Sequence, residues 1–150
     1  MPYRLIYKST ATKPIDSQLL DDISKIATIN NKRDNITGLL LATGESFLQI
    51  LEGNFIELNE LLSKIERDSR HKDLKIISYE PINSIYFDDW NLKAVGYNAF
   101  TDSIKTLLST KYGRDKNKNL LIPEDPSIAF SLLFDVQYYL RNQKKSILYN

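Results

Sequence analysis

Two polar side chains with hydrogen-bonding capacity lie in segments that are otherwise typical of buried β-strands. Gln49 lies inside the apolar run 47–51, and Tyr7 ends the strand-like segment 3–7. Leaving a primary amide unpaired in a protein interior costs roughly 1–3 kcal/mol. If the two strands are neighbours, the phenol and the amide converge on one spot that a polar ligand could complete. An inward amide bonded only to backbone groups is an equally good interpretation of Gln49 alone.

Further polar residues stand near the ends of two predicted helices. Asn30 and Asn31 end the first helix, and Arg70 and His71 follow the second. Together with the phenol and the amide, they would surround a groove between the helices that suits a planar heterocycle with carbonyl and imino edges. Arg70 and His71 could contact a phosphate or hydroxyl tail. Each of the four residues, taken alone, is more often part of an ordinary helix terminus.

Apolar side chains of both helices and of the central strand would form the walls of this groove. They are Ile23, Ile26, Phe47 and Ile65. Such residues also form the core stripe of any amphipathic helix, so they are expected to be packed in either interpretation.

The composition excludes several kinds of site. The chain has 150 residues, no Cys and one His, which excludes disulfides, Cys-based zinc sites and multi-His metal sites. No glycine-rich nucleotide motif is present, and segment 8–11 lacks the glycines of a phosphate-binding loop, which weakens the alternative of a small phosphate-handling enzyme. Asp21 and Asp22 point about 100° apart on a helix, as expected for a solvated face and not for a catalytic pair. We therefore expect a binding protein and no enzyme.

Charge and hydropathy narrow the range of partners. The net charge is +1, which gives no electrostatic reason to expect binding to nucleic acid or to an anionic membrane. No stretch approaches the roughly 18 apolar residues of a membrane span, and no signal peptide is evident. A cytoplasmic protein is the expectation.

Hydrophobic periodicity predicts five strands and two helices in residues 1–98. The strands are expected at 3–8, 36–42, 46–52, 74–82 and 90–95, with helices after Asp16 and after Gly53. The order βαββαββ predicts an α+β fold, a ferredoxin-like sandwich with both helices on one sheet face. We expect the first and third strands to be parallel neighbours at the centre of the sheet. Tyr7 and Gln49 would then be adjacent.

Residues 99–150 are predicted to form a two-helix C-terminal extension. Asp102 is the expected N-cap of the first helix, with Ile104, Leu107 and Leu108 inward and Gly113 at its end. An extension of this length would cover the open sheet face, or present a docking surface for a protein partner or a second copy. The second helix is expected to begin at Asp125-Pro126 and to bury a face formed by Ala129, Leu132, Leu133, Val136 and Leu140.

An ordered set of motifs resembles the BLUF domain, the blue-light sensor module that uses FAD. The resemblance covers nearly all of residues 1–98 and implies a sensor domain there, with residues 99–150 similar to the helical tail of short stand-alone BLUF photoreceptors. It implies FAD as the cofactor, with FMN or riboflavin as alternatives, and a separate effector protein as the partner. The matching stretches are Tyr3-Arg4-Leu5-Ile6-Tyr7, Asn30-Asn31, Ile36-Thr37-Gly38-Leu39-Leu40, Phe47-Leu48-Gln49-Ile50-Leu51-Glu52-Gly53, Asp68-Ser69-Arg70-His71 and Asp88-Asp89-Trp90.

The resemblance also implies a role for each polar residue of the groove. Tyr7 would donate an electron and a proton to the excited flavin, and Gln49 would lie between the phenol and the flavin edge. A changed orientation or tautomer of Gln49 would give a red-shifted signalling state. Asn31, with Asn30 beside it, would contact the polar edge of the ring.

The remaining implied roles concern the tail of the cofactor and the relay of the signal. Arg70 and His71 would flank the ribityl-phosphate side, held by Asp68. Trp90 would be the mobile aromatic residue of the fifth strand, near Gln49. The family often has Met two residues later, where this chain has Leu92, so the relay is the step in which this chain departs from the pattern. A flavin- or small-molecule-binding module without light function is the alternative.

Overall fold

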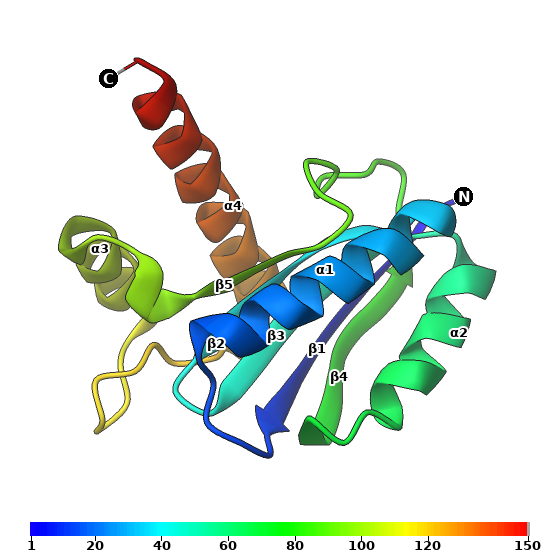
Figure 1. Cartoon of the computed structure of the whole chain (residues 1–150), viewed down its shortest axis with the longest axis horizontal. Coiled ribbons are helices and arrows are strands. Elements are labelled where there is room, and N and C mark those ends of the chain that lie inside the picture. The colour runs from blue at the N-terminus through cyan, green and yellow to red at the C-terminus, as the bar shows by residue number, and fades with distance from the viewer. Residues whose placement is uncertain (150) are drawn as a thin grey trace.

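A five-stranded sheet with helices on both faces forms the body of the protein (Figure 1). The computed structural model describes the backbone of residues 1–149 and the side chains of residues 1–143. The order of elements confirms the predicted ferredoxin-like βαββαββ fold and the two C-terminal helices. The elements are β1 (Tyr3–Ala11), α1 (Ser17–Arg33), β2 (Thr37–Thr43), β3 (Ser46–Gly53), α2 (Phe55–Glu66), β4 (His71–Pro81), β5 (Lys93–Gly96), a 3-10 turn (Tyr97–Ala99), α3 (Asp102–Tyr112) and α4 (Pro126–Tyr149).

The strand order β4-β1-β3-β2-β5 makes β1 and β3 central neighbours, as predicted. The expected parallel direction of this pair is wrong, because β1 and β3 are antiparallel. The crossover through α1 lets β2 run in the same direction as β1, and the β2–β3 hairpin then reverses the chain. The register nevertheless places Tyr7 directly opposite Gln49.

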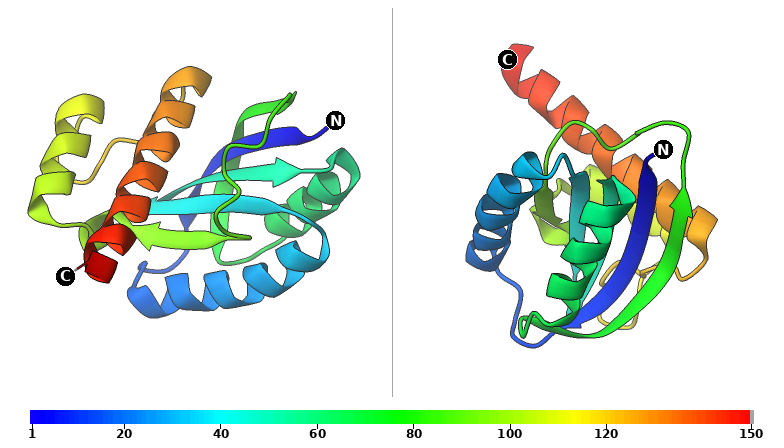
Figure 2. Two further views of the ribbon diagram at one scale, coloured as in Figure 1. Left: turned by 90° about the horizontal axis from the view of Figure 1, so that it is seen from above. Right: turned by 90° about the vertical axis from the view of Figure 1, so that its right-hand side faces the viewer.

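α1 and α2 lie on one face of the sheet, and α4 lies on the opposite face (Figure 2). Because neighbouring residues of a strand point to opposite faces, the strands contribute to two separate cores. Burial on both faces explains why the run 47–51 is almost wholly apolar. The core beneath α4 joins Ile6, Leu39, Leu41, Leu48 and Ile50 to the predicted helix residues Ala129, Leu132, Leu133 and Val136.

Helix α1 begins as predicted and ends later than predicted. The Asp16 carboxylate accepts a hydrogen bond at 2.8 Å from the backbone N–H three residues later, which makes it the N-cap. The helix continues to Arg33, and the chain reverses at Asn35, which adopts a left-handed conformation with φ 55°. Asn30 and Asn31 therefore lie in the last turn of α1.

The two outer strands differ from their predicted bounds. β4 begins at His71, three residues before the expected start, and β5 contains only Lys93–Gly96. The prediction that Trp90 lies in the fifth strand is wrong. Before Lys93, the chain is held to β2 by one backbone bond, from the Gly38 N–H to the Trp90 carbonyl at 3.1 Å. The side-chain Nδ2 of Asn91 adds a hydrogen bond to the Ile36 carbonyl at 3.0 Å.

The C-terminal extension packs against the sheet through α4. Thr101, and not the predicted Asp102, caps α3 through its hydroxyl. Leu107, expected to point inward, is 55% exposed, whereas Leu108 is buried. The Asp125 carboxylate caps α4 as predicted. Within residues 1–149, no helix is both long enough and apolar enough to span a membrane.

A buried ion pair joins the two central strands beneath α4. Arg4 Nη2 lies 2.7 Å from Glu52 Oε2, and the second Glu52 oxygen accepts hydrogen bonds from the backbone N–H groups of Tyr86 (2.9 Å) and Phe87 (2.5 Å). The Arg4 guanidinium also lies over the ring of Phe130 in α4, 4.7 Å from its centroid. The ion pair and these additional contacts therefore connect β1 and β3 with the chain after β4 and with α4.

We expect Glu52→Gln to lower the free energy of unfolding by about 3–5 kcal/mol, because it leaves the Arg4 charge buried without its partner. Urea unfolding followed by circular dichroism measures this loss. Glu124→Gln is the matched control, since Glu124 pairs with Lys8 and Lys75 at the surface and such pairs contribute less than about 1 kcal/mol. Equal losses in the two variants would contradict the importance of the buried pair.

Candidate functional site

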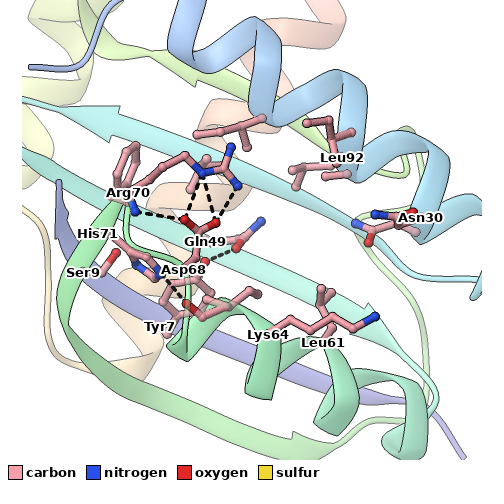
Figure 3. A pocket seen from close by; sticks show the side chains of 17 residues that line it. Tyr7, Ser9, Asn30, Gln49, Leu61, Lys64, Asp68, Arg70, His71 and Leu92 are labelled. Carbon is pink, nitrogen blue, oxygen red and sulfur yellow. Dashed lines mark hydrogen bonds and ion pairs between the residues drawn. The ribbon is translucent and has the colours of Figure 1, made fainter. Parts of the chain in front are cut away.

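A cavity of about 200 Å³ opens between α1 and α2 above the central strands (Figure 3). The structure brings all of the predicted ligand-binding residues to this one cavity, although they come from both helices, from three strands and from the chain between α2 and β4. They are Tyr7, Ile23, Ile26, Asn30, Asn31, Phe47, Gln49, Ile65, Asp68, Arg70 and His71.

The floor of the cavity holds the phenol and the amide. The Tyr7 hydroxyl donates a hydrogen bond to Gln49 Oε1, and both side chains are buried. Burial raises the pKa of Tyr7, and the Asp68 carboxylate raises it further, against a smaller opposing effect of Arg70. The phenol is therefore neutral and able to donate. Among the described residues Gln49 Nε2 has no hydrogen-bond partner, and it points away from Tyr7 (Figure 3).

The Asp68–His71 segment closes one end of the cavity. Asp68 accepts hydrogen bonds from Arg70 Nε at 3.0 Å and from the Arg70 backbone N–H at 2.9 Å. The hydrogen bonds from Arg70 hold the pKa of Asp68 below its usual value. His71 Nε2 lies 2.6 Å from the Ile65 carbonyl. Because a carbonyl can only accept, this nitrogen carries the hydrogen, and the imidazole is held against α2.

Asn31 and the chain before β5 form another part of the cavity wall. Asn31 is 2% exposed, and its Nδ2 donates to the Asn91 carbonyl at 3.0 Å. The Leu92 carbonyl accepts from two hydroxyls of α1, and the Leu92 side chain lines the cavity. Trp90 is not among the side chains that line it in the part of the chain that the structure describes. Leu92, and not Trp90 as expected, is therefore the residue before β5 whose side chain lies at the cavity.

Sequence reasoning missed several residues of the cavity. Ser9 carries the clearest signal, because it lies two residues after Tyr7 and so shares its face of a strand. The predicted strand stopped at Lys8, whereas β1 continues to Ala11. The full set of missed residues is Ser9, Ala27, Leu40, Leu61, Lys64 and Leu92.

The flavin ring implied by the resemblance fits this arrangement. Ile23 of α1 and Ile65 of α2 supply apolar walls, and the floor presents the amide Nε2 of Gln49, which has no hydrogen-bond partner among the described residues. Polar atoms without partners between apolar walls suit a flat ring with polar edges. The cavity is smaller than the roughly 300–1,000 Å³ of sites that enclose a whole ligand, so it suits a ring whose tail stays outside. No three Asp, Glu or His residues gather as a metal site within the described chain.

Comparison with known proteins gives the same family. The family model of sensors of blue light using FAD (BLUF) matches residues 3–93. Photoactivated adenylate cyclase subunit alpha of Euglena gracilis is 31% identical over 157 aligned residues, which cover 90% of this chain and 15% of that protein. A bacterial light-regulated adenylyl cyclase of known structure is 34% identical, with a TM-score of 0.67 over 74% of this chain and 34% of the other. BlrB, a BLUF protein in its dark state, is 28% identical, with a TM-score of 0.63 over 75% of this chain and 88% of BlrB.

The matched segment is only a small part of the longer relatives. This chain spans 15% of the length of the curated cyclase relative, and the family match at 3–93 contains every predicted cavity residue. On this evidence the chain belongs to the BLUF family, the flavin-based sensors of blue light that use FAD.

Proposed function

We propose that the light response of this chain begins at the hydrogen bond between Tyr7 and Gln49. One observation carries the proposal: the bond lies on the floor of the cavity, and the other end of the amide is free to bond a ligand. Asn31 and Gln49 would bond the polar edge of FAD, Ile23 and Ile65 would pack against its ring, and Arg70 would contact its more polar part. Bound oxidised FAD supplies blue-light absorption and, in the excited state, a strong electron acceptor.

Tyr7 is suited to lose an electron and a proton together. Its raised pKa keeps the phenol neutral before illumination. A phenol that loses an electron becomes a strong acid, and Gln49 Oε1 is already in place to accept the proton. Return of the electron and the proton restores the neutral phenol.

Gln49 is suited to record this event as a change of orientation or tautomer. An amide can present either its acceptor or its donor end to Tyr7, and the opposite end then faces the cavity. The two arrangements have different hydrogen bonds at the cavity floor, so one side chain acts as a two-state switch. A stronger bond from Gln49 to a carbonyl of the bound ring would shift the absorption to the red.

The β4–β5 connection, residues 82–92, supports a route from the cavity to α4. Leu92 lines the cavity at one end of this segment. Further back, Asp89 pairs with Arg141 of α4, with Nη2 and Oδ1 3.1 Å apart, and the Tyr86 carbonyl accepts from Gln137 Nε2 of α4 at 3.0 Å. A shift of the β4–β5 connection would therefore move the contacts of α4, which is how a small change at a site becomes a change of packing.

We further propose that the output is a protein–protein contact made by the α3–α4 extension, with a separate effector or a second copy as the partner, and not catalysis by this chain. A relative named as an adenylate cyclase subunit supports an effector that is distinct from the sensor region, because the matched segment is 15% of its length. A flavin-binding module without light function is the competing candidate. An absorption spectrum before and after blue light decides between them.

We expect Tyr7→Phe and Gln49→Leu to bind flavin and to lose at least about 90% of the reversible red shift, because each removes one partner of the switch. Difference spectra of the purified proteins, before and after illumination and during dark recovery, measure the shift. Tyr79→Phe is the matched control, since Tyr79 is a half-buried tyrosine on the same sheet face that bonds Asn59. A normal shift in Tyr7→Phe would refute the donor role.

We expect wild-type apoprotein to lose more stability than Tyr7→Phe between pH 9 and pH 11. The pKa of Tyr7 is raised in the folded state by burial, whereas the unfolded phenol ionises near pH 10. Above that pH the folded state binds more protons than the unfolded state, so stability falls with rising pH, by up to about 1.4 kcal/mol per pH unit for one group. Urea unfolding of both proteins at the two pH values measures the difference. Equal losses would contradict a buried neutral phenol.

We expect Arg141→Gln to keep the red shift but to remove most of the light-induced change in α4, because it cuts the tie between Asp89 and the helix. Hydrogen exchange of α4 amides in the dark and in the light measures that change. Lys111→Gln is the matched control, since Lys111 ties α3 to Asp135 of α4 and does not contact the β4–β5 connection. An unchanged light response of α4 in Arg141→Gln would exclude the Asp89–Arg141 tie as the link to α4 and leave only the Gln137 contact with the Tyr86 carbonyl.

A further inference from the structure

Four aromatic side chains form one exposed surface where the β4–β5 connection meets α4. We call Tyr86, Phe130, Phe134 and Tyr138 the aromatic surface. Tyr86 is 51% exposed, Phe134 42% and Tyr138 55%. The Phe130 ring joins two of them, because its centroid lies 6.2 Å from that of Tyr86 and 6.0 Å from that of Phe134. Exposed rings that adjoin one another, unlike single scattered ones, are typical of an interaction site.

Three of these rings follow one ridge of α4. Phe130, Phe134 and Tyr138 are spaced four residues apart, and rows with this spacing are the ridges that pack into the grooves of a neighbouring helix. The Arg4 guanidinium, held in its buried ion pair, lies 4.7 Å from the Phe130 centroid and 5.3 Å from the Tyr86 centroid. These contacts order the base of the aromatic surface before any partner binds, which lowers the entropic cost of association.

Charge favours a second copy of this chain as the occupant of the aromatic surface. The four rings carry no charge, and both charged residues of α4 within 126–143 are already paired, Arg141 with Asp89 and Asp135 with Lys111. An uncharged apolar surface is complementary to itself. A surface with unpaired charge of one sign would instead repel its own copy and select an oppositely charged partner.

The size of the aromatic surface fits a weak and reversible contact. A buried aromatic side chain removes roughly 150–250 Å² from water, so three half-exposed rings offer about 300 Å² per copy. Two such surfaces with a polar rim around them bury less than about 1,200 Å² in total, which is the range of transient contacts and not of permanent dimers. A contact of this strength is one that a small movement can form or break.

We propose that this chain pairs with a second copy of itself through the aromatic surface, with the two α4 helices antiparallel about a two-fold axis near Phe134. Such an axis sets Phe134 against its own counterpart and Phe130 against the partner's Tyr138. The inference rests on the proposed function, since it names the partner of the α3–α4 extension. Tyr86 belongs to the β4–β5 connection, so a shift of that connection would alter the contact between the copies.

Sedimentation velocity over a series of protein concentrations tests the pairing. Wild type is expected to dimerise with a dissociation constant on the order of 10–100 μM. Phe134→Lys and, separately, Phe134→Glu are expected to weaken association at least about tenfold, because each sets two like charges face to face at the axis. An equal mixture of the two variants is expected to associate again, since opposite charges then meet. Ile56→Lys, which changes an exposed apolar residue of α2 on the other face of the sheet, is the matched control and is expected to associate as wild type does.

Tyr138→Lys is a second variant, at a more exposed position of the same ridge, and it is expected to weaken association as well. Far-ultraviolet circular dichroism shows which variants are folded. A monomeric wild type, association beyond the dimer, unchanged association of folded Tyr138→Lys, an equal loss in Ile56→Lys, or no recovery in the mixture would each overturn the inference.

Difference spectra of the same wild-type samples before and after blue light keep the two proposals apart. A monomeric protein with a normal red shift overturns the pairing alone. A protein that dimerises but shows no red shift overturns the proposed light response alone.

Discussion

One hydrogen bond, from the phenol of Tyr7 to the carboxamide of Gln49, depends on the pairing of the two central strands and gives the cavity its chemistry. The antiparallel register sets these two residues opposite each other. A slip of one residue in either strand would turn that strand's side chain to the α4 face and separate the phenol from the amide, since alternate residues of a strand point to opposite sides. The apolar neighbours of Gln49 bury β3 on both faces, but an apolar run of this kind does not by itself fix the register.

The same two strands carry a second buried polar pair on their other face, which resists such a slip. Arg4 and Glu52 lie opposite each other in the β1–β3 register and face α4, three residues from Tyr7 and from Gln49 respectively. In a wrong register Arg4 and Glu52 would be buried apart, at a cost of several kcal/mol. Two polar pairs on opposite faces thus define one register. The contribution of Arg4 and Glu52 to the register is a structural reason for burying two charges close to the ligand site.

The sequence predicted the composition of the cavity better than the arrangement of the chain around it. Helical spacing identified the walls of the cavity because α1 and α2 each bury one face, whereas apolar runs identified β1 and β3, which are buried on both faces. The antiparallel direction of β1 and β3 follows from connectivity, and the prediction failed in that geometric step. Trp90 was misplaced because alternation over 90–95 reports burial and does not distinguish a ladder from a segment held by the Asn91 side chain. Ser9 was missed because the predicted strand ended at Lys8, so the alternation that places Ser9 on the face of Tyr7 was not followed to it.

The position of Leu92 bears on how a change at the floor of the cavity could reach α4. Its side chain meets the cavity while its carbonyl is bonded by two hydroxyls of α1, so α1 restrains its backbone more than its side chain. A branched aliphatic side chain adapts less readily than the Met that often occupies this place in the family. Under the proposed relay, a displacement that a flexible thioether would absorb would instead pass to the backbone of the β4–β5 connection. Leu92 would then couple the cavity to α4 more rigidly, through the ion pair between Asp89 and Arg141.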